Sequence, residues 1–158
     1  MDIFRGFCSV IFSKESMMYR WNDELYIGNS VVDSQHKTLF KIAEKVETLM
    51  KDCRPSGAGT KDTARQKRVL QETIKYLKSY AIEHFAAEEA FQQEIGYERY
   101  EAHKKIHDNF IASVEQMEQR IYENDCGDEY VKQFLDWFSA WLYNHIMHED
   151  QRIVKKQS

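Results

Sequence analysis

Apolar side chains recur every three or four residues along four separate stretches of the chain. The repeat is clearest in residues 62–94, where its positions are Leu70, Ile74, Leu77, Ala81, His84, Glu88 and Phe91. Steps of three and four place such positions along one face of a helix, which then faces inward. Similar repeats run through residues 33–52, 98–125 and 128–155, and no long stretch alternates with period two. We therefore predict four amphipathic helices and no strands.

Turn-forming residues separate these stretches. The only proline, Pro55, lies in a segment that also contains Gly57 and Gly59, and Gly96 and Gly127 mark two further helix ends. Short links between amphipathic helices favour an all-α, antiparallel up-and-down four-helix bundle. Residues 1–18 lie outside the repeat and are expected to form an N-terminal extension, followed by one domain over residues 19–158.

Ionisable residues occupy some of the positions that are expected to face inward: His36, His84, Glu88, His103, His107, His145 and Asp150. Two residues four apart share one face of a helix, and two pairs here have that spacing. One such histidine is more often an ordinary core residue, but recurrence on four segments favours a shared role. Burying these groups without partners is costly. A dinuclear metal centre removes that cost, and iron suits the ligands, with zinc, manganese and copper chemically possible.

The last carboxylate of this set is ambiguous. On an α-helix, Asp150 lies about 140° around the axis from His145, whereas Glu149 lies about 40° from it. Spacing alone therefore leaves Glu149 as a rival ligand. His148, the sixth histidine, is expected to be a surface residue or a neighbour of the ligands.

Composition and motifs exclude several classes of protein. The net charge is −4 and no basic stripe occurs, which excludes nucleic acid as a partner. No apolar run approaches the roughly 20 residues of a membrane span. Three scattered cysteines fit reduced thiols in the cytoplasm better than a disulfide framework. Neither the Glu-x-x-His motif of ferritin-like proteins nor the His-Glu-x-x-His motif of zinc proteases is present.

The chain resembles the hemerythrin family, specifically its single-domain bacterial members, over about residues 19–155. The matching pieces are Trp21-Asn22, Gly28, Val32–Phe40, His84–Glu89, Gly96-Tyr97, His103–His107 and Trp141–Asp150. The resemblance implies one iron bound by three histidines and a second bound by two. It also implies bridges from two carboxylates and a solvent-derived oxo or hydroxo group. The implied ligands are His103, His107 and His145 for the first iron, His36 and His84 for the second, and Glu88 and Asp150 as bridges.

The implied coordination leaves one position open on the iron that has two histidines, and dioxygen would bind there. Five residues match the family's apolar dioxygen pocket, although plain core packing would also explain them: Leu39, Phe85, Trp141, Leu142 and Ile146. The resemblance therefore implies reversible dioxygen binding without catalysis, for storage, transport or delivery to an oxygen-requiring enzyme. The alternatives are a di-iron enzyme (a peroxidase, an oxidase or a nitric-oxide-handling protein) and an oxygen or redox sensor.

Overall fold

Four long helices make up most of the chain in the computed structural model, which describes residues 20–52, 63–123 and 128–155. The helices are α1 (Ser30–Asp52), α2 (Thr63–Glu94), α3 (Tyr100–Glu123) and α4 (Asp128–His145). A π-helical turn (Ile146–Asp150) and the short helix α5 (Gln151–Lys155) continue α4 to residue 155. No strand occurs in the described ranges. The predicted all-α fold is confirmed.

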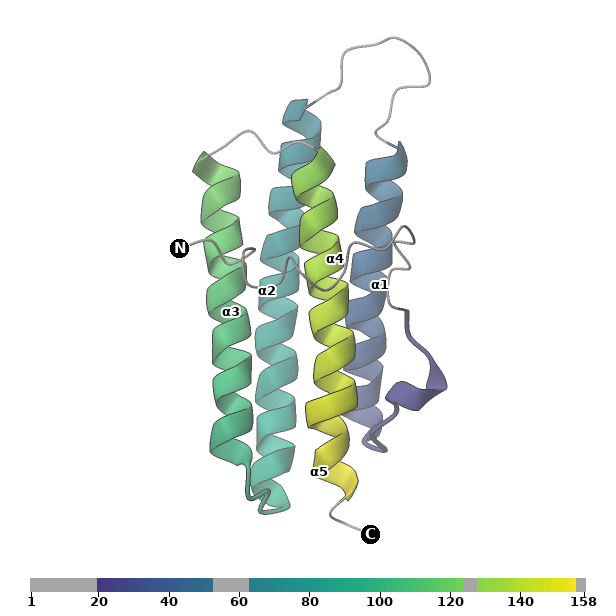
Figure 1. The fold of residues 1–158 in the computed structure, drawn as a ribbon, viewed down its shortest axis with the longest axis vertical. Coiled ribbons are helices and arrows are strands. Elements are labelled where there is room, and N and C mark those ends of the chain that lie inside the picture. The colour runs from purple at the N-terminus through teal and green to yellow at the C-terminus, as the bar shows by residue number, and fades with distance from the viewer. Residues whose placement is uncertain (1–19, 53–62, 124–127, 156–158) are drawn as a thin grey trace.

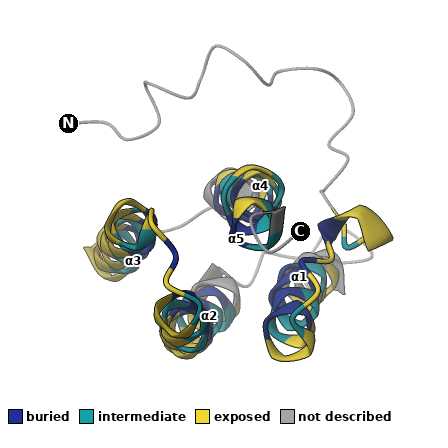
Figure 2. Cartoon of the chain, turned by 90° about the horizontal axis from the view of Figure 1, so that it is seen from below, coloured by how far each residue is buried: buried dark blue, intermediate teal, exposed yellow. Residues whose placement is uncertain are grey.

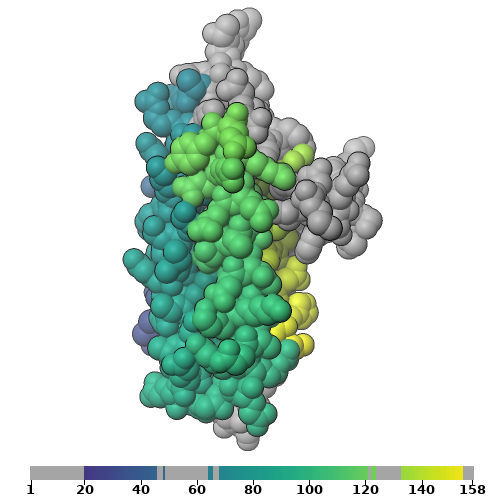
Figure 3. Space-filling view, turned by 90° about the vertical axis from the view of Figure 1, so that its left-hand side faces the viewer, coloured from purple at the N-terminus to yellow at the C-terminus, as the bar shows by residue number. Residues whose placement is uncertain are grey.

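The helices stand side by side as a bundle (Figure 1). Helix α1 packs against α2 and α4, and α2 packs against α3. Seen along the bundle, the buried residues of each helix face the space between the four (Figure 2). In the space-filling view, α3 lies in front between α2 and the C-terminal segment (Figure 3). Neighbours in sequence are therefore neighbours in space, as short connections require.

The helix ends differ from the predicted ones by a few residues, and the first difference has a clear cause. Helix α1 begins at Ser30 rather than near residue 33, because the Asn29 side chain caps it. Asn29 Oδ1 accepts from the backbone N–H groups of Val31 and Val32, each at 3.1 Å. At the same end of the bundle (Figure 1), Gly96 has φ +64° and turns the chain out of α2. These caps fix where each helix begins or ends, and so fix the level of its side chains.

The core consists of aliphatic and aromatic side chains from the long helices and from the segments that adjoin them, such as Leu25, Ile27 and Ile146. Leu70, Ile74, Leu77 and Ala81 are buried as predicted. One expected inward position is wrong: Phe91 is only half-buried, and Gln92 is fully buried in its place. The inward face of α2 therefore continues from Glu88 by a step of four rather than three.

Two expectations concern residues that the structure does not describe. The N-terminal extension (residues 1–18) and the three cysteines, Cys8, Cys53 and Cys126, all lie outside the described residues. Of the helices that are described, none combines the length and the apolar character needed to cross a bilayer.

Candidate metal centre

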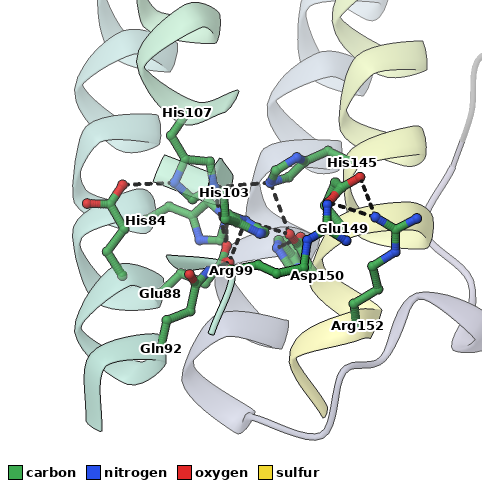
Figure 4. Close-up of polar contacts among 12 residues, drawn as sticks. His84, Glu88, Gln92, Arg99, His103, His107, His145, Glu149, Asp150 and Arg152 are labelled. Carbon is green, nitrogen blue, oxygen red and sulfur yellow. Dashed lines mark hydrogen bonds and ion pairs between the residues drawn. The ribbon is translucent and has the colours of Figure 1, made fainter. Parts of the chain in front are cut away.

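All seven expected ligand residues meet at one level of the bundle. Helix α1 supplies His36, α2 supplies His84 and Glu88, and α3 supplies His103 and His107. His145 ends α4, and Asp150 ends the π-helical turn. None of the seven is more than 4% exposed. Figure 4 shows the labelled members of this group converging from α2, α3 and the C-terminal segment.

The five imidazoles form two groups that share Asp150. Asp150 Oδ1 lies 3.0 Å from His145 Nε2 and 3.3 Å from His103 Nε2. Its second oxygen, Oδ2, lies 3.2 Å from His36 Nε2. We call His103, His107 and His145 the three-histidine set, and His36 and His84 the two-histidine set. One oxygen of Asp150 therefore faces each set.

The two carboxylate oxygens of Glu88 also face different histidines. Its Oε1 lies 2.9 Å from His103 Nε2, within the three-histidine set. Its Oε2 lies 3.7 Å from His84 Nε2, and also 3.8 Å from His107 Nε2. Both buried carboxylates can thus place one oxygen toward each histidine set, which is the arrangement that a bridging ligand needs.

The spacing of the donor atoms fits metal coordination. Two ligands at right angles on one ion, each about 2.1 Å from it, are about 3.0 Å apart. His107 Nε2 and His145 Nε2 are 3.1 Å apart, close to that value. Both ring nitrogens of His36, and Nε2 of His84, are buried without a hydrogen-bond partner among the described residues. Nitrogen lone pairs that converge in a dry interior are stabilised by a cation, so these residues fit a metal centre.

The π-helical turn places Asp150, rather than Glu149, beside the histidines. The Gln151 N–H donates to the carbonyl of Ile146, an i→i+5 bond that widens the turn. Residues five apart then lie on the same side, so Asp150 aligns with His145. Glu149 points outward, and its carboxylate lies 3.0 Å from Arg152 Nη1 and 3.8 Å from Arg99 Nη2 (Figure 4). The angle of about 140° between His145 and Asp150 holds only for an uninterrupted α-helix. The π-helical turn interrupts the helix, so that angle no longer argues against Asp150.

Burial and neighbouring charges shift the protonation of the ligands. Burial lowers the pKa of His84 well below its usual value, and the neighbouring His36 adds to that shift. Burial, His145 and His103 likewise lower the pKa of His107 far below its usual value. Both rings are therefore neutral at pH 7, as metal ligation requires.

His103 behaves in the opposite way. Burial alone would lower its pKa, but hydrogen bonds to Asp150 and Glu88 outweigh this and raise the pKa to about 9. Burial also opposes ionisation of Asp150, yet His145 and the hydrogen-bonding imidazoles hold its pKa well below the usual range. Without a metal, a proton on His103 therefore lies between two carboxylates, and a metal ion would displace it.

Two polar side chains orient the imidazoles from outside the cluster. Glu89 Oε1 lies 2.9 Å from His107 Nδ1, and Gln35 Oε1 lies 3.2 Å from His84 Nδ1. An acceptor at Nδ1 holds the proton there, which leaves the Nε2 lone pair directed at the centre. Sequence analysis missed both residues. Each adjoins a ligand in the chain, but adjacent helical residues point about 100° apart, so adjacency gave no signal.

The five expected pocket residues lie in the same region. Phe85 stacks on His107 with ring centroids 3.8 Å apart, and Trp141 stacks on His145 at 4.5 Å. Leu39, Leu142 and Ile146 are buried in the hydrophobic core. Phe85 and Trp141 therefore cover His107 and His145 with aromatic surface. His148 is exposed, which fits the expected surface position.

A buried histidine and carboxylate cluster inside a four-helix bundle defines a metal-binding protein of the all-α class. The sequence profile described as "Hemerythrin HHE cation binding domain" matches residues 28–156, so the chain belongs to the hemerythrin family. That family binds dioxygen and has an iron site. The resemblance seen in the sequence is confirmed.

Curated relatives support the same membership. A protein named bacteriohemerythrin from Clostridium acetobutylicum is 31% identical over 137 residues, which cover 87% of this chain and 99% of the relative. A bacteriohemerythrin from Pseudomonas paraeruginosa is 36% identical over 135 residues, covering 85% of this chain and 78% of the relative. One from Campylobacter jejuni is 30% identical over 129 residues, covering 82% and 87%.

Proposed function

We propose that this protein binds dioxygen reversibly at a pair of iron ions, and so stores, transports or delivers oxygen. The observation that carries the proposal is the division of the carboxylates between the two sets. Asp150 directs Oδ1 toward the three-histidine set and Oδ2 toward His36. Glu88 directs Oε1 toward His103, and its Oε2 lies between His84 and His107. Such a division suits two ions that share both carboxylates, and a single ion would leave one set of imidazoles without a partner.

The ligand roles follow from this division. The three-histidine set would hold one iron, the two-histidine set the other, and both carboxylates would bridge them. When bound, the iron pair supplies the electrons for reversible dioxygen binding. Because the two-histidine set provides fewer side-chain ligands, we assign the open position to its iron.

The apolar surround favours binding over turnover. Phe85 and Trp141 cover two of the imidazoles, and Leu39, Leu142 and Ile146 are buried close to the ligands in the chain. Side chains of this kind exclude water and supply no proton, which slows further oxidation of the centre. We therefore assign these five residues to the dioxygen pocket and propose a non-enzymatic function. Delivery to an oxygen-requiring enzyme in the cytoplasm is part of the same proposal.

Optical spectroscopy of the iron-loaded protein tests the proposal. The purified protein should contain about two irons per chain, change colour when dioxygen is added, and recover its first spectrum under vacuum. Zinc-loaded protein serves as the control, because zinc has no redox chemistry and should give no change. A protein that holds two irons but never changes its spectrum with dioxygen would contradict the proposal. Steady consumption of dioxygen with a reductant, faster than autoxidation, would instead support a di-iron enzyme.

A further inference from the structure

Gln92 lies directly beside the candidate metal centre, at a position that the proposed ligand set does not include. It follows Glu88 by one turn of α2 and is fully buried. Glutamine is seldom completely buried, because its amide must find partners inside the protein. Figure 4 shows Gln92 next to Glu88 on the inward side of α2.

The Gln92 amide makes a short hydrogen bond to the bridging carboxylate. Its Nε2 donates to Glu88 Oε1 at 2.6 Å, and both groups are buried. The orientation of the amide follows from chemistry, since an amide oxygen this close to a carboxylate oxygen would be repelled. Gln92 Oε1 has no hydrogen-bond partner among the described residues. The described hydrogen bonding of this side chain is therefore directed entirely at Glu88.

The bond reaches one particular oxygen of Glu88. Oε1 is the atom that lies 2.9 Å from His103 Nε2, whereas Oε2 lies 3.7 Å from His84 Nε2 and 3.8 Å from His107 Nε2. Holding Oε1 on the His103 side prevents the carboxylate from rotating, and so keeps Oε2 within reach of His84 in the two-histidine set. A hydrogen bond also withdraws electron density from the oxygen that receives it. Gln92 can therefore influence both the direction of Glu88 and its strength as a donor.

We propose that Gln92 is a positioning residue that holds Glu88 in its bridging orientation and weakens it as a donor toward the iron of the three-histidine set. The inference rests on the proposed function, because it concerns the same pair of ions. Its consequence is a reduction potential higher than Glu88 would give alone, since a weaker anionic donor stabilises ferric iron less.

The test replaces the donor while keeping the space filled. Gln92→Met has similar length and no N–H, and Gln93→Met, at the exposed neighbouring position, is the matched control. Metal-free protein is titrated with zinc, and the reduction potential of the iron-loaded protein is measured. We expect Gln92→Met to lose about tenfold in zinc affinity, because the loss of the fixed Glu88 orientation outweighs the stronger donation of the freed carboxylate. We also expect its potential to shift to a more negative value. The control should match the wild type in both measurements.

The result differs if Gln92 only fills space in the core and does not hold Glu88. In that case methionine fills the site, and neither zinc affinity nor potential departs from the wild type, which would overturn the proposal. A shift of the potential to a more positive value would overturn it as well. Zinc binding requires no dioxygen, so these results are independent of whether the iron protein binds dioxygen.

A measurement on the wild type covers the case in which Gln92→Met does not fold. In zinc-loaded protein, the side-chain amide protons of Gln92 should exchange slowly with solvent and show the NMR shift of a carboxylate-bound donor. Those of the exposed Gln93 should exchange rapidly. If the two amides behave alike, Gln92 does not hold Glu88 and the proposal is wrong.

Discussion

Replacing Asp150 by Asn, with Glu149→Gln as its counterpart, separates the two carboxylates that sequence spacing could not distinguish. Asp150 is fully buried and lies 3.0–3.3 Å from three imidazoles, one of which, His103, carries a proton in the metal-free protein. Removing one partner of such a buried pair costs about 3–5 kcal/mol of unfolding free energy. Glu149 is partly exposed and pairs with the exposed Arg152, so its replacement should cost less than about 1 kcal/mol.

Chemical denaturation of the metal-free variants at pH 6 and at pH 10 measures both the cost and its cause. The folded-state pKa of His103, about 9, is above the ordinary value of 6.5. Its stabilising contribution is therefore fully present below pH 6.5 and is lost as the pH rises through about 9. The deficit of Asp150→Asn should accordingly be larger at pH 6 than at pH 10, whereas that of Glu149→Gln should stay small at both.

Iron content completes the comparison. Glu149→Gln should retain about two irons per chain, and Asp150→Asn should hold fewer, because the carboxylate that we propose as a bridge has become a neutral amide. The reasoning is refuted if Glu149→Gln loses iron while Asp150→Asn keeps it. That result would mean that the C-terminal segment continues as a regular α-helix in the protein.

Three further predictions concern other parts of the centre and the fold. His36→Ala should abolish the spectral change with dioxygen, while circular dichroism still shows a helical protein and iron analysis still finds iron, held by the three-histidine set. Reversible dioxygen binding by this variant would show that the open position is assigned to the wrong iron. Zinc affinity of the metal-free protein should rise about tenfold per pH unit between pH 7 and 9, because zinc must displace the proton from His103; an affinity that is flat over this range would contradict the raised pKa. Gly96→Ala should lower the free energy of unfolding by about 1–2 kcal/mol, because Gly96 has φ +64°, a conformation that is unfavourable for alanine. The added Cβ would meet no atom within 4 Å, so the cost comes from the backbone alone. Unchanged thermal stability would contradict the left-handed conformation of Gly96.

Much of the architecture follows from the sequence by itself. The three-and-four repeat of apolar residues is a property of neighbouring positions on one helix, so it gave four helices with ends within a few residues of those observed. The same repeat placed His84 and Glu88 on the inward face of α2, where both are buried. Histidines and carboxylates at inward positions also pointed to a shared centre, because each would be costly to bury alone.

Other features depend on how the helices meet, and no local pattern contains them. The α-helical period placed Glu149 nearer to His145, but the π-helical turn carries Asp150 to the inner side, and its i→i+5 bond is visible only in the structure. The step from Glu88 to Gln92 rather than Phe91 likewise depends on which side of α2 its neighbours cover. The division of the two carboxylates between the histidine sets arises from contacts among residues up to 114 positions apart, His36 and Asp150 among them. Sequence periodicity determines which face of a helix is inward, and packing of the four helices decides which atoms on those faces meet.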